Sequence, residues 1–209
     1  MLINYYPKYS NLDDIINLTT FEYDTINLFI DLKNCIQPLY MKHNMELMIE
    51  NTKMEKRIDS SLLTDLFSFL TFHKIYAMKR NKKIKFFIFY ETGQSFFHKN
   101  IYKYYKIKRK IDAFNGLDKE NRELFTTIMQ KNFSLIETAL NVIPNVWVIK
   151  MENLEADFIP YYLINENLID TNAYNIIYSN DHDMFQILEL GDNIFQYRRI
   201  RSYRDILKN

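Results

Sequence analysis

The sequence predicts an α/β fold in which helices flank a mostly parallel central sheet. Three observations lead to this prediction. Short apolar runs rich in aromatic and β-branched residues recur along the chain, as buried strands do. Longer stretches with helical spacing of apolar residues separate them, which is the arrangement that parallel strands require. Only 3 of the 209 residues are Gly and 4 are Pro, which argues against a disordered or linker-like chain.

Five apolar segments are predicted as strands. The first two, Ile-Asn-Leu-Phe-Ile-Asp and Ile-Lys-Phe-Phe-Ile-Phe-Tyr, combine residue types that favour a buried pleated segment. The third carries Val-Trp-Val-Ile, the fourth Tyr-Asn-Ile-Ile-Tyr, and the last is the short run Ile-Phe-Gln-Tyr. In order along the chain, the expected strands are residues 26–31, 84–90, 145–150, 174–179 and 193–197.

Helices are expected between these strands. Pro38 interrupts the first, and Ser60 or Ser61 is the expected N-cap of the second. Pro160 is tolerable only in the first turn of the last helix. The expected helices cover residues 31–48, 60–79, 118–141 and 154–165.

Composition narrows the class of protein. Hydrophobic residues make up 47% of the chain, which is enough for a sizeable core. The single cysteine, Cys35, excludes a disulfide framework and a Cys-based zinc cluster. The apolar runs are too short to span a bilayer, and no secretory signal is visible at the N-terminus. We therefore expect a single domain over residues 1–209, in the cytoplasm of a cell or of a virus-infected host, with no membrane partner.

Charge is balanced in total, at +1, but is unevenly distributed. Residues 99–110 carry six basic side chains and no acid, and residues 198–209 form a basic tail. Basic side chains interleaved with tyrosines are typical of nucleic-acid binding, although a solvated helix whose tyrosines pack on the core remains an alternative. The candidate nucleic-acid-binding residues are Lys99, Lys103, Tyr105, Lys108 and Lys110.

Acidic residues follow four successive predicted strands. A single acid past a strand is usually a helix cap, but four in succession are hard to explain as caps. The carboxyl ends of parallel strands meet at one edge of a sheet, and clustered carboxylates repel one another unless a cation neutralises them. An all-oxygen cluster selects Mg²⁺ or Mn²⁺, and a pair of such ions about 4 Å apart serves phosphodiester hydrolysis. The candidate metal ligands are Asp31, Glu91, Glu155, Asp157, Asp181 and Asp183.

Four motifs resemble, in the same order, those of flap endonucleases and phage-type 5′–3′ exonucleases. Asp31 with Asn34 is similar to the first-strand Asp-x-x-Asn, and Leu-Glu-Ala-Asp157 is similar to Glu-Ala-Asp-Asp. Residues 179–186 are similar to Ser-x-Asp-x-Asp-x-x-Gln. Segment 91–109 is similar to the arch motif. Its residues in register are Gly93, Ser95, Phe97, Tyr105, Lys106 and Arg109.

The resemblance, which covers about residues 26–197, implies a PIN-like 5′-nuclease core. It implies a helical arch or clamp over about residues 97–141, under or through which a single-stranded 5′ end passes. Lys106 and Arg109 would contact the scissile phosphate as catalytic residues, and Tyr105 would support the arch or stack on a base. The six acids divide into two metal sites. Those of the first three strands would surround one ion, and Asp181 and Asp183 would hold the other.

The resemblance departs from the family pattern in four places, one of which is His98, where the phage pattern has Arg. Glu91 stands where the family has Asp, and Phe158 stands where a second Asp is common. Only 26 residues follow Asp183, so we expect the C-terminal helix–hairpin–helix element to be missing. That element also supplies an Asp to the second metal. By sequence alone, Asp192 and Asp205 lie within reach of that position.

The function implied is a metal-dependent 5′–3′ exonuclease or flap endonuclease in replication or repair. Its partners would be DNA 5′ ends, flaps and single strands, or an RNA–DNA hybrid. The alternative is a catalytically impaired or split PIN-like domain that binds nucleic acid or a partner protein. In the split form, a second chain would supply the missing duplex-binding element.

Overall fold

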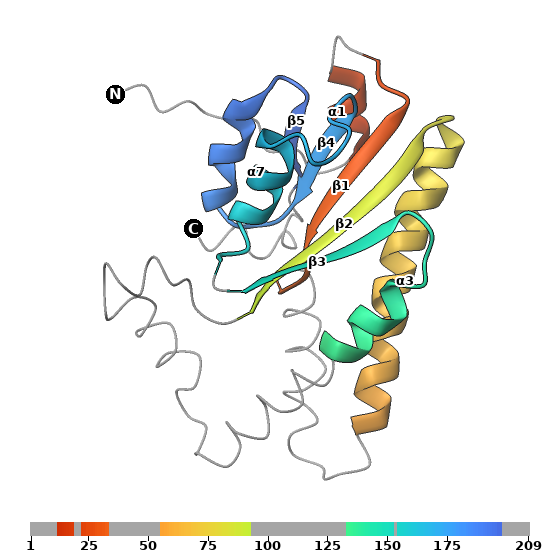
Figure 1. Cartoon of the computed structure of the whole chain (residues 1–209). Helices are drawn as coiled ribbons and strands as arrows, with labels where there is room; N and C mark the ends of the chain where they lie inside the picture. Colours follow the sequence, from red (N-terminus) through yellow and green to blue (C-terminus); the bar gives the residue numbers. More distant parts are fainter. Residues whose placement is uncertain (1–11, 19–21, 34–54, 93–132, 153, 198–209) are drawn as a thin grey trace, which may run out of the picture.

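A five-stranded sheet, parallel throughout, forms the centre of the molecule (Figure 1). The computed structural model describes residues 12–18, 22–33, 55–92, 133–152 and 154–197. The strand order is β3-β2-β1-β4-β5, which confirms the predicted α/β class. The strands are β1 (Thr25–Asp31), β2 (Lys83–Thr92), β3 (Val146–Glu152), β4 (Tyr174–Tyr178) and β5 (Ile194–Tyr197).

The central strand β1 is buried on both faces of the sheet. It pairs with β2 on one side and β4 on the other, with Ile30 opposite Ile88 and Tyr178. Ile26, Leu28 and Ile30 belong to one hydrophobic cluster, and Phe29 to the other. A strand covered on both faces reads as a continuous apolar run, which is why the sequence identified it.

Two helices and the helical residues 133–140 cover one face of the sheet. They are α1 (Leu12–Leu18) and α3 (Glu55–Lys79), and both contribute to the same buried cluster. Helix α1 was not predicted, because seven residues are too few for a clear helical period. The predicted N-cap at Ser60 or Ser61 is wrong, since α3 begins five residues earlier with the helix formers Glu55, Lys56 and Arg57.

The opposite face is covered by α7 (Phe158–Asn165) and the 3₁₀ helix η1 (Asp183–Leu190). The predicted start of this helix at residue 154 is wrong, since α7 begins at Phe158, and this later start places Pro160 in the first turn, where proline is tolerated. Phe29 of β1 stacks on Phe87 of β2 with 5.1 Å between ring centroids, beneath this layer.

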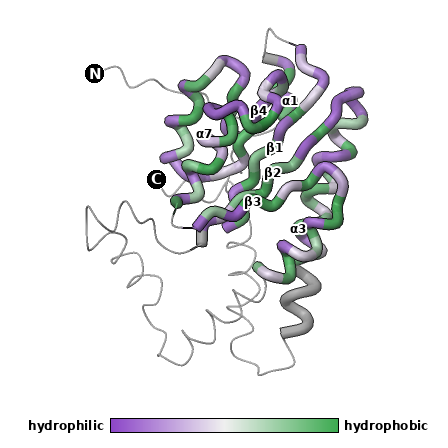
Figure 2. Tube along the Cα trace, viewed as in Figure 1, coloured by the Kyte–Doolittle hydropathy of each residue, from purple (hydrophilic) through white to green (hydrophobic). Residues whose placement is uncertain are grey.

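The turn between α3 and β2 shows how asparagine ends a helix here. Asn81 adopts the left-handed conformation with φ 53°. This conformation lets the Lys82 amide donate to Ala77 O at 2.9 Å, closing the last helical turn. The surrounding residues are hydrophilic, whereas apolar residues line the strands (Figure 2).

Asparagine amides cross-link the amino edge of the sheet. Asn27 Nδ2 donates to Asn175 Oδ1 at 2.9 Å and to Asp170 O at 2.8 Å. Asn175 Nδ2 and Asn193 Nδ2 both donate to Thr171 O, at 3.0 and 2.8 Å. Strands β1 and β4 and the turn before β5 are therefore joined by side chains as well as by backbone hydrogen bonds.

Some expected elements fall wholly or partly outside the described residues. They include the helix after Asp31, of which only Leu32 and Lys33 are described and helical, the proposed arch up to residue 132, and the tail from residue 198. At the end of the expected arch span, Ile136 and Leu140 pack into the core. No helix in the described part of the chain is long and apolar enough to cross a membrane.

His73 of α3 should make stability depend on pH. Its side chain is 2% exposed, and burial lowers the pKa of its imidazole, which makes a 2.8 Å hydrogen bond with Phe69 O. The imidazole therefore binds a proton more readily in the unfolded chain than in the folded one. As a result, the free energy of unfolding should fall as the pH drops below about 6.5, by at most about 1.4 kcal/mol per pH unit.

We expect His73→Leu to flatten this fall in the unfolding free energy between pH 7 and 5.5, measured by urea denaturation. The control is His182→Leu, at an exposed histidine, which should follow the wild type. Equal slopes for the wild type and both variants would contradict the prediction.

Candidate active site

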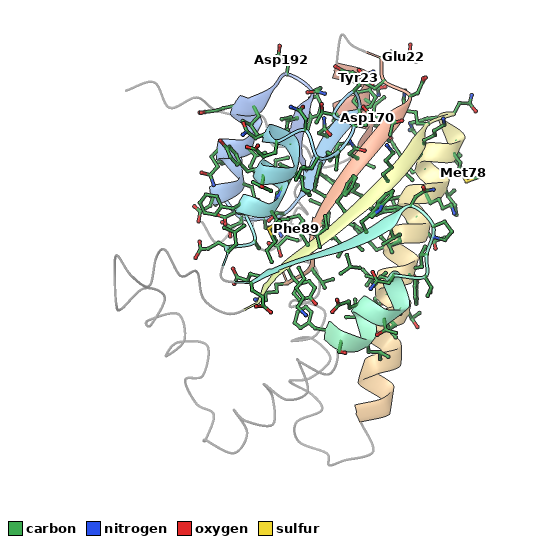
Figure 3. All side chains as sticks on the ribbon, in the orientation of Figure 1. Glu22, Tyr23, Met78, Phe89, Asp170 and Asp192 are labelled. Atoms are coloured by element: carbon green, nitrogen blue, oxygen red, sulfur yellow. The ribbon has the colours of Figure 1, made fainter. Side chains whose placement is uncertain are left out.

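The carboxyl edge of the sheet brings the predicted acidic residues to one side of the molecule. Asp31 is the last residue of β1, and Glu91 lies near the end of β2. Asp31 is in register with Phe89, so Asp31 and Glu91 project from the same face, that of α7 and η1. Figure 3 shows Phe89 toward this edge, whereas Glu22 and Asp170 mark the opposite edge.

Glu155 and Asp157 lie in the turn between β3 and α7. Glu155 is buried, and its carbonyl accepts the Phe158 amide at 3.1 Å. The Ala156 amide, between the two acids, donates to Glu91 Oε2 at 3.3 Å. This contact ties the acid of β2 to the acidic turn that follows β3.

Asp157 carries the clearest electrostatic signal in the site. Burial raises the pKa of its carboxyl to about 6, and the negative charges of Glu155, Asp183 and Asp181 contribute to the rise. Its Oδ1 atom is buried and has no hydrogen-bond partner among the described residues. A buried carboxylate oxygen without a partner, close to like charges, is stabilised when a cation binds.

Asp181 and Asp183 follow β4 in a loop held by its own hydrogen bonds. The Asp181 amide donates to Ser179 Oγ at 3.1 Å, and the Asp183 amide donates to Asp181 Oδ1 at 3.1 Å. Gln196 of β5 fixes the same loop, because its Nε2 donates to Ser179 O at 2.9 Å and to Asp181 O at 2.8 Å.

The sequence interpretation did not identify Gln196 as part of the site. It lies in the buried run Ile-Phe-Gln-Tyr, and its side chain is 1% exposed. A buried amide in an apolar strand must find hydrogen-bond partners, and this requirement is the signal that the sequence contained.

Lys33 is a second residue that the sequence interpretation did not include. Its Nζ lies 3.3 Å from Glu91 Oε1, so the site contains a cation of its own.

In the part of the chain that is described, no three His, Cys, Asp or Glu side chains lie close enough together to hold a metal ion. The donors nevertheless suit Mg²⁺ or Mn²⁺ chemically, since all are carboxylates and one buried oxygen lacks a partner.

The remaining predicted residues are placed as follows. Asp192 lies two residues before β5, at the amino edge, so it cannot join the acids at the opposite edge (Figure 3). Asp205 and all of the predicted phosphate- and strand-binding residues lie outside the described residues. Those binding residues are Lys99, Lys103, Tyr105, Lys106, Lys108, Arg109 and Lys110.

Comparison with solved structures identifies the fold. The sequence matches no family model and no curated protein. Three structures from bacteriophage T5 are similar over 83% of this chain. They are a flap endonuclease complex with DNA and metal ions (16% identity, TM-score 0.55), a 5′-exonuclease with bound zinc (15%, 0.54) and a metal-ion co-crystal of the flap endonuclease protein (18%, 0.52).

The chain spans about half the length of these phage proteins, at 54, 55 and 54% respectively. At identities below 20%, the likeness concerns the arrangement of the elements, which here is an all-parallel five-stranded sheet between helical layers. This chain has the PIN-like α/β fold of the 5′-nucleases.

Proposed function

We propose that the chain is a metal-dependent nuclease that hydrolyses phosphodiester bonds near the 5′ ends of DNA. The observation that carries this proposal is the buried, unpartnered Oδ1 of Asp157, which lies among three further carboxylates that raise its pKa. The fold supports the proposal, because the similar phage T5 structures are described as a flap endonuclease bound to DNA and a 5′-exonuclease.

Each acidic group has a role in this proposal. Asp31, Glu91, Glu155 and Asp157 would hold one Mg²⁺ or Mn²⁺ ion, and Asp181 and Asp183 would hold a second. Bound ions would supply an activated water and neutralise charge at the phosphate. Gln196 and Ser179 keep the second pair of acids in position. Lys106 and Arg109 would contact the scissile phosphate.

The basic residues of segment 99–110 would hold the nucleic-acid strand through its phosphates. Lys99, Lys103, Lys108 and Lys110 would supply the charges, and Tyr105 would stack on a base. In this reading the substrates are 5′ flaps and single-stranded 5′ ends.

A second candidate is an impaired or split domain that binds nucleic acid or a partner protein. The ion pair between Lys33 and Glu91 favours it, because it engages a carboxylate that the first metal would need.

The test is cleavage of a 5′-labelled DNA flap by the purified chain with Mg²⁺ or Mn²⁺. EDTA should stop cleavage, and the Asp181→Ala/Asp183→Ala variant should be inactive while still folded by circular dichroism. Absence of cleavage at every metal concentration would refute the active single-chain nuclease. Cleavage only after a second chain is added would select the split enzyme.

A further inference from the structure

Lys33 lies two residues beyond the end of β1, inside the carboxylate site. Its Nζ is 3.3 Å from Glu91 Oε1, and the two side chains are 39% and 24% exposed. Four acids of the site repel one another, namely Asp157 and the three acids that raise its pKa. Glu91, by contrast, already has a positively charged partner.

Both oxygens of Glu91 are engaged. Oε1 accepts from Lys33 at 3.3 Å, and Oε2 accepts from the Ala156 amide at 3.3 Å. Each carboxylate oxygen has a second lone pair, so a hydrogen bond alone would not exclude a metal ion, but a divalent cation at Oε1 would meet the like charge of the Lys33 ammonium group, 3.3 Å from that oxygen. The Ala156 contact belongs to the backbone of a turn, whereas the Lys33 contact is made by a flexible, partly exposed side chain.

We propose that Lys33 is the internal counter-ion of the carboxylate site, and that a divalent cation binds at Glu91 by displacing the Lys33 ammonium group. The proposal rests on the proposed function, because it concerns the same carboxylates. A partly exposed ion pair is weak enough to be exchanged for a divalent ion. Lys33 then lowers the apparent metal affinity, because it competes for Glu91 and also repels the incoming cation.

The consequence can be measured without DNA. Removal of the Lys33 charge should tighten Mn²⁺ binding, so that Lys33→Met lowers the Mn²⁺ concentration at half saturation by about three- to tenfold. Lys33→Arg keeps the charge and should bind Mn²⁺ like the wild type. The probe is Mn²⁺ alone, with free ion measured by electron paramagnetic resonance on the full chain.

Lys83→Met is the matched control. Lys83 is exposed and begins β2 opposite Thr25, at the amino edge of the sheet, so this variant changes the net charge equally but far from the site. It should bind Mn²⁺ like the wild type. Glu91→Gln placed in the Lys33→Met background should abolish the gain, which assigns the effect to the Lys33–Glu91 pair.

Several results would overturn the proposal. The first is that Lys33→Met binds Mn²⁺ no more tightly than Lys83→Met. The second is that the tighter Mn²⁺ binding of Lys33→Met persists when Glu91→Gln is added. The third is that no variant binds Mn²⁺. Failure of the nuclease function looks different. A wild-type chain that binds Mn²⁺ but cleaves no flap would refute the nuclease proposal, while the comparison of Lys33→Met with Lys83→Met would still decide the role of Lys33.

Discussion

Asp157→Asn should slow flap cleavage by at least about 100-fold and, in the absence of metal, make the protein more stable. We expect this loss of rate because removing a carboxylate that ligates a metal should lower activity at least as much as removing an outer group that orients such a ligand. The gain in stability follows from the raised pKa of Asp157, about 6, since the folded state disfavours its ionised form.

The sign of this stability change can be derived for each pH range. Above about pH 6 the carboxyl is ionised in both states, and burial among like charges destabilises the folded one. The neutral amide removes this penalty, which we place at about 1 kcal/mol after allowing for solvent screening. Below about pH 4 Asp157 is protonated whether folded or unfolded, so the gain should vanish.

The measurements are single-turnover cleavage with Mg²⁺ and urea denaturation in EDTA at pH 7. Asp192→Asn is the matched control, because Asp192 is exposed at the opposite edge of the sheet. It should leave both quantities unchanged. If Asp157→Asn were less stable than the wild type in EDTA, the unpartnered Oδ1 could not reflect an electrostatic penalty.

Gln196→Met should cost about 2–4 kcal/mol of unfolding free energy. Methionine preserves most of the side-chain volume but removes two donors, which leaves the carbonyls of Ser179 and Asp181 without these partners. The loop that carries Asp181 and Asp183 should then be free to move, and Mn²⁺ binding should weaken several-fold.

The control for this variant is Gln186→Met, since Gln186 is exposed on η1. Urea denaturation in EDTA measures the cost of the lost hydrogen bonds, and Mn²⁺ titration under conditions where both variants are folded measures positioning. A loss of stability with unchanged Mn²⁺ affinity would show that Gln196 supports the core alone.

The strands and their acids were predictable because both depend on local sequence. Buried parallel strands appear as apolar runs, and an acid at the end of such a run must lie at the carboxyl edge. Asp31 and Glu91 could therefore be assigned to one edge before the strand order was known. Helix α1 and the start of α3 were missed, since α1 has only seven residues and the first four residues of α3, Glu-Lys-Arg-Ile, include one apolar residue.

Lys33 and Gln196 were missed for a different reason. The role of each depends on a partner far away in the chain, since Lys33 meets Glu91 58 residues later and Gln196 meets Ser179 17 residues earlier. A lysine after a strand or a glutamine within one is ordinary by itself. The strand order brings each pair together, because it places β1 beside β2 and β4 beside β5.

The two edges of the sheet also differ in how they should respond to partial unfolding. Asparagine amides cross-link β1, β4 and the turn before β5 at the amino edge, whereas like charges gather at the carboxyl edge. Local opening should therefore begin among the acidic loops and reach the asparagine-linked edge last. Amide protons of the Ser179–Asp183 loop should exchange with solvent before those around Asn27 and Asn175, and cation binding should reduce that difference.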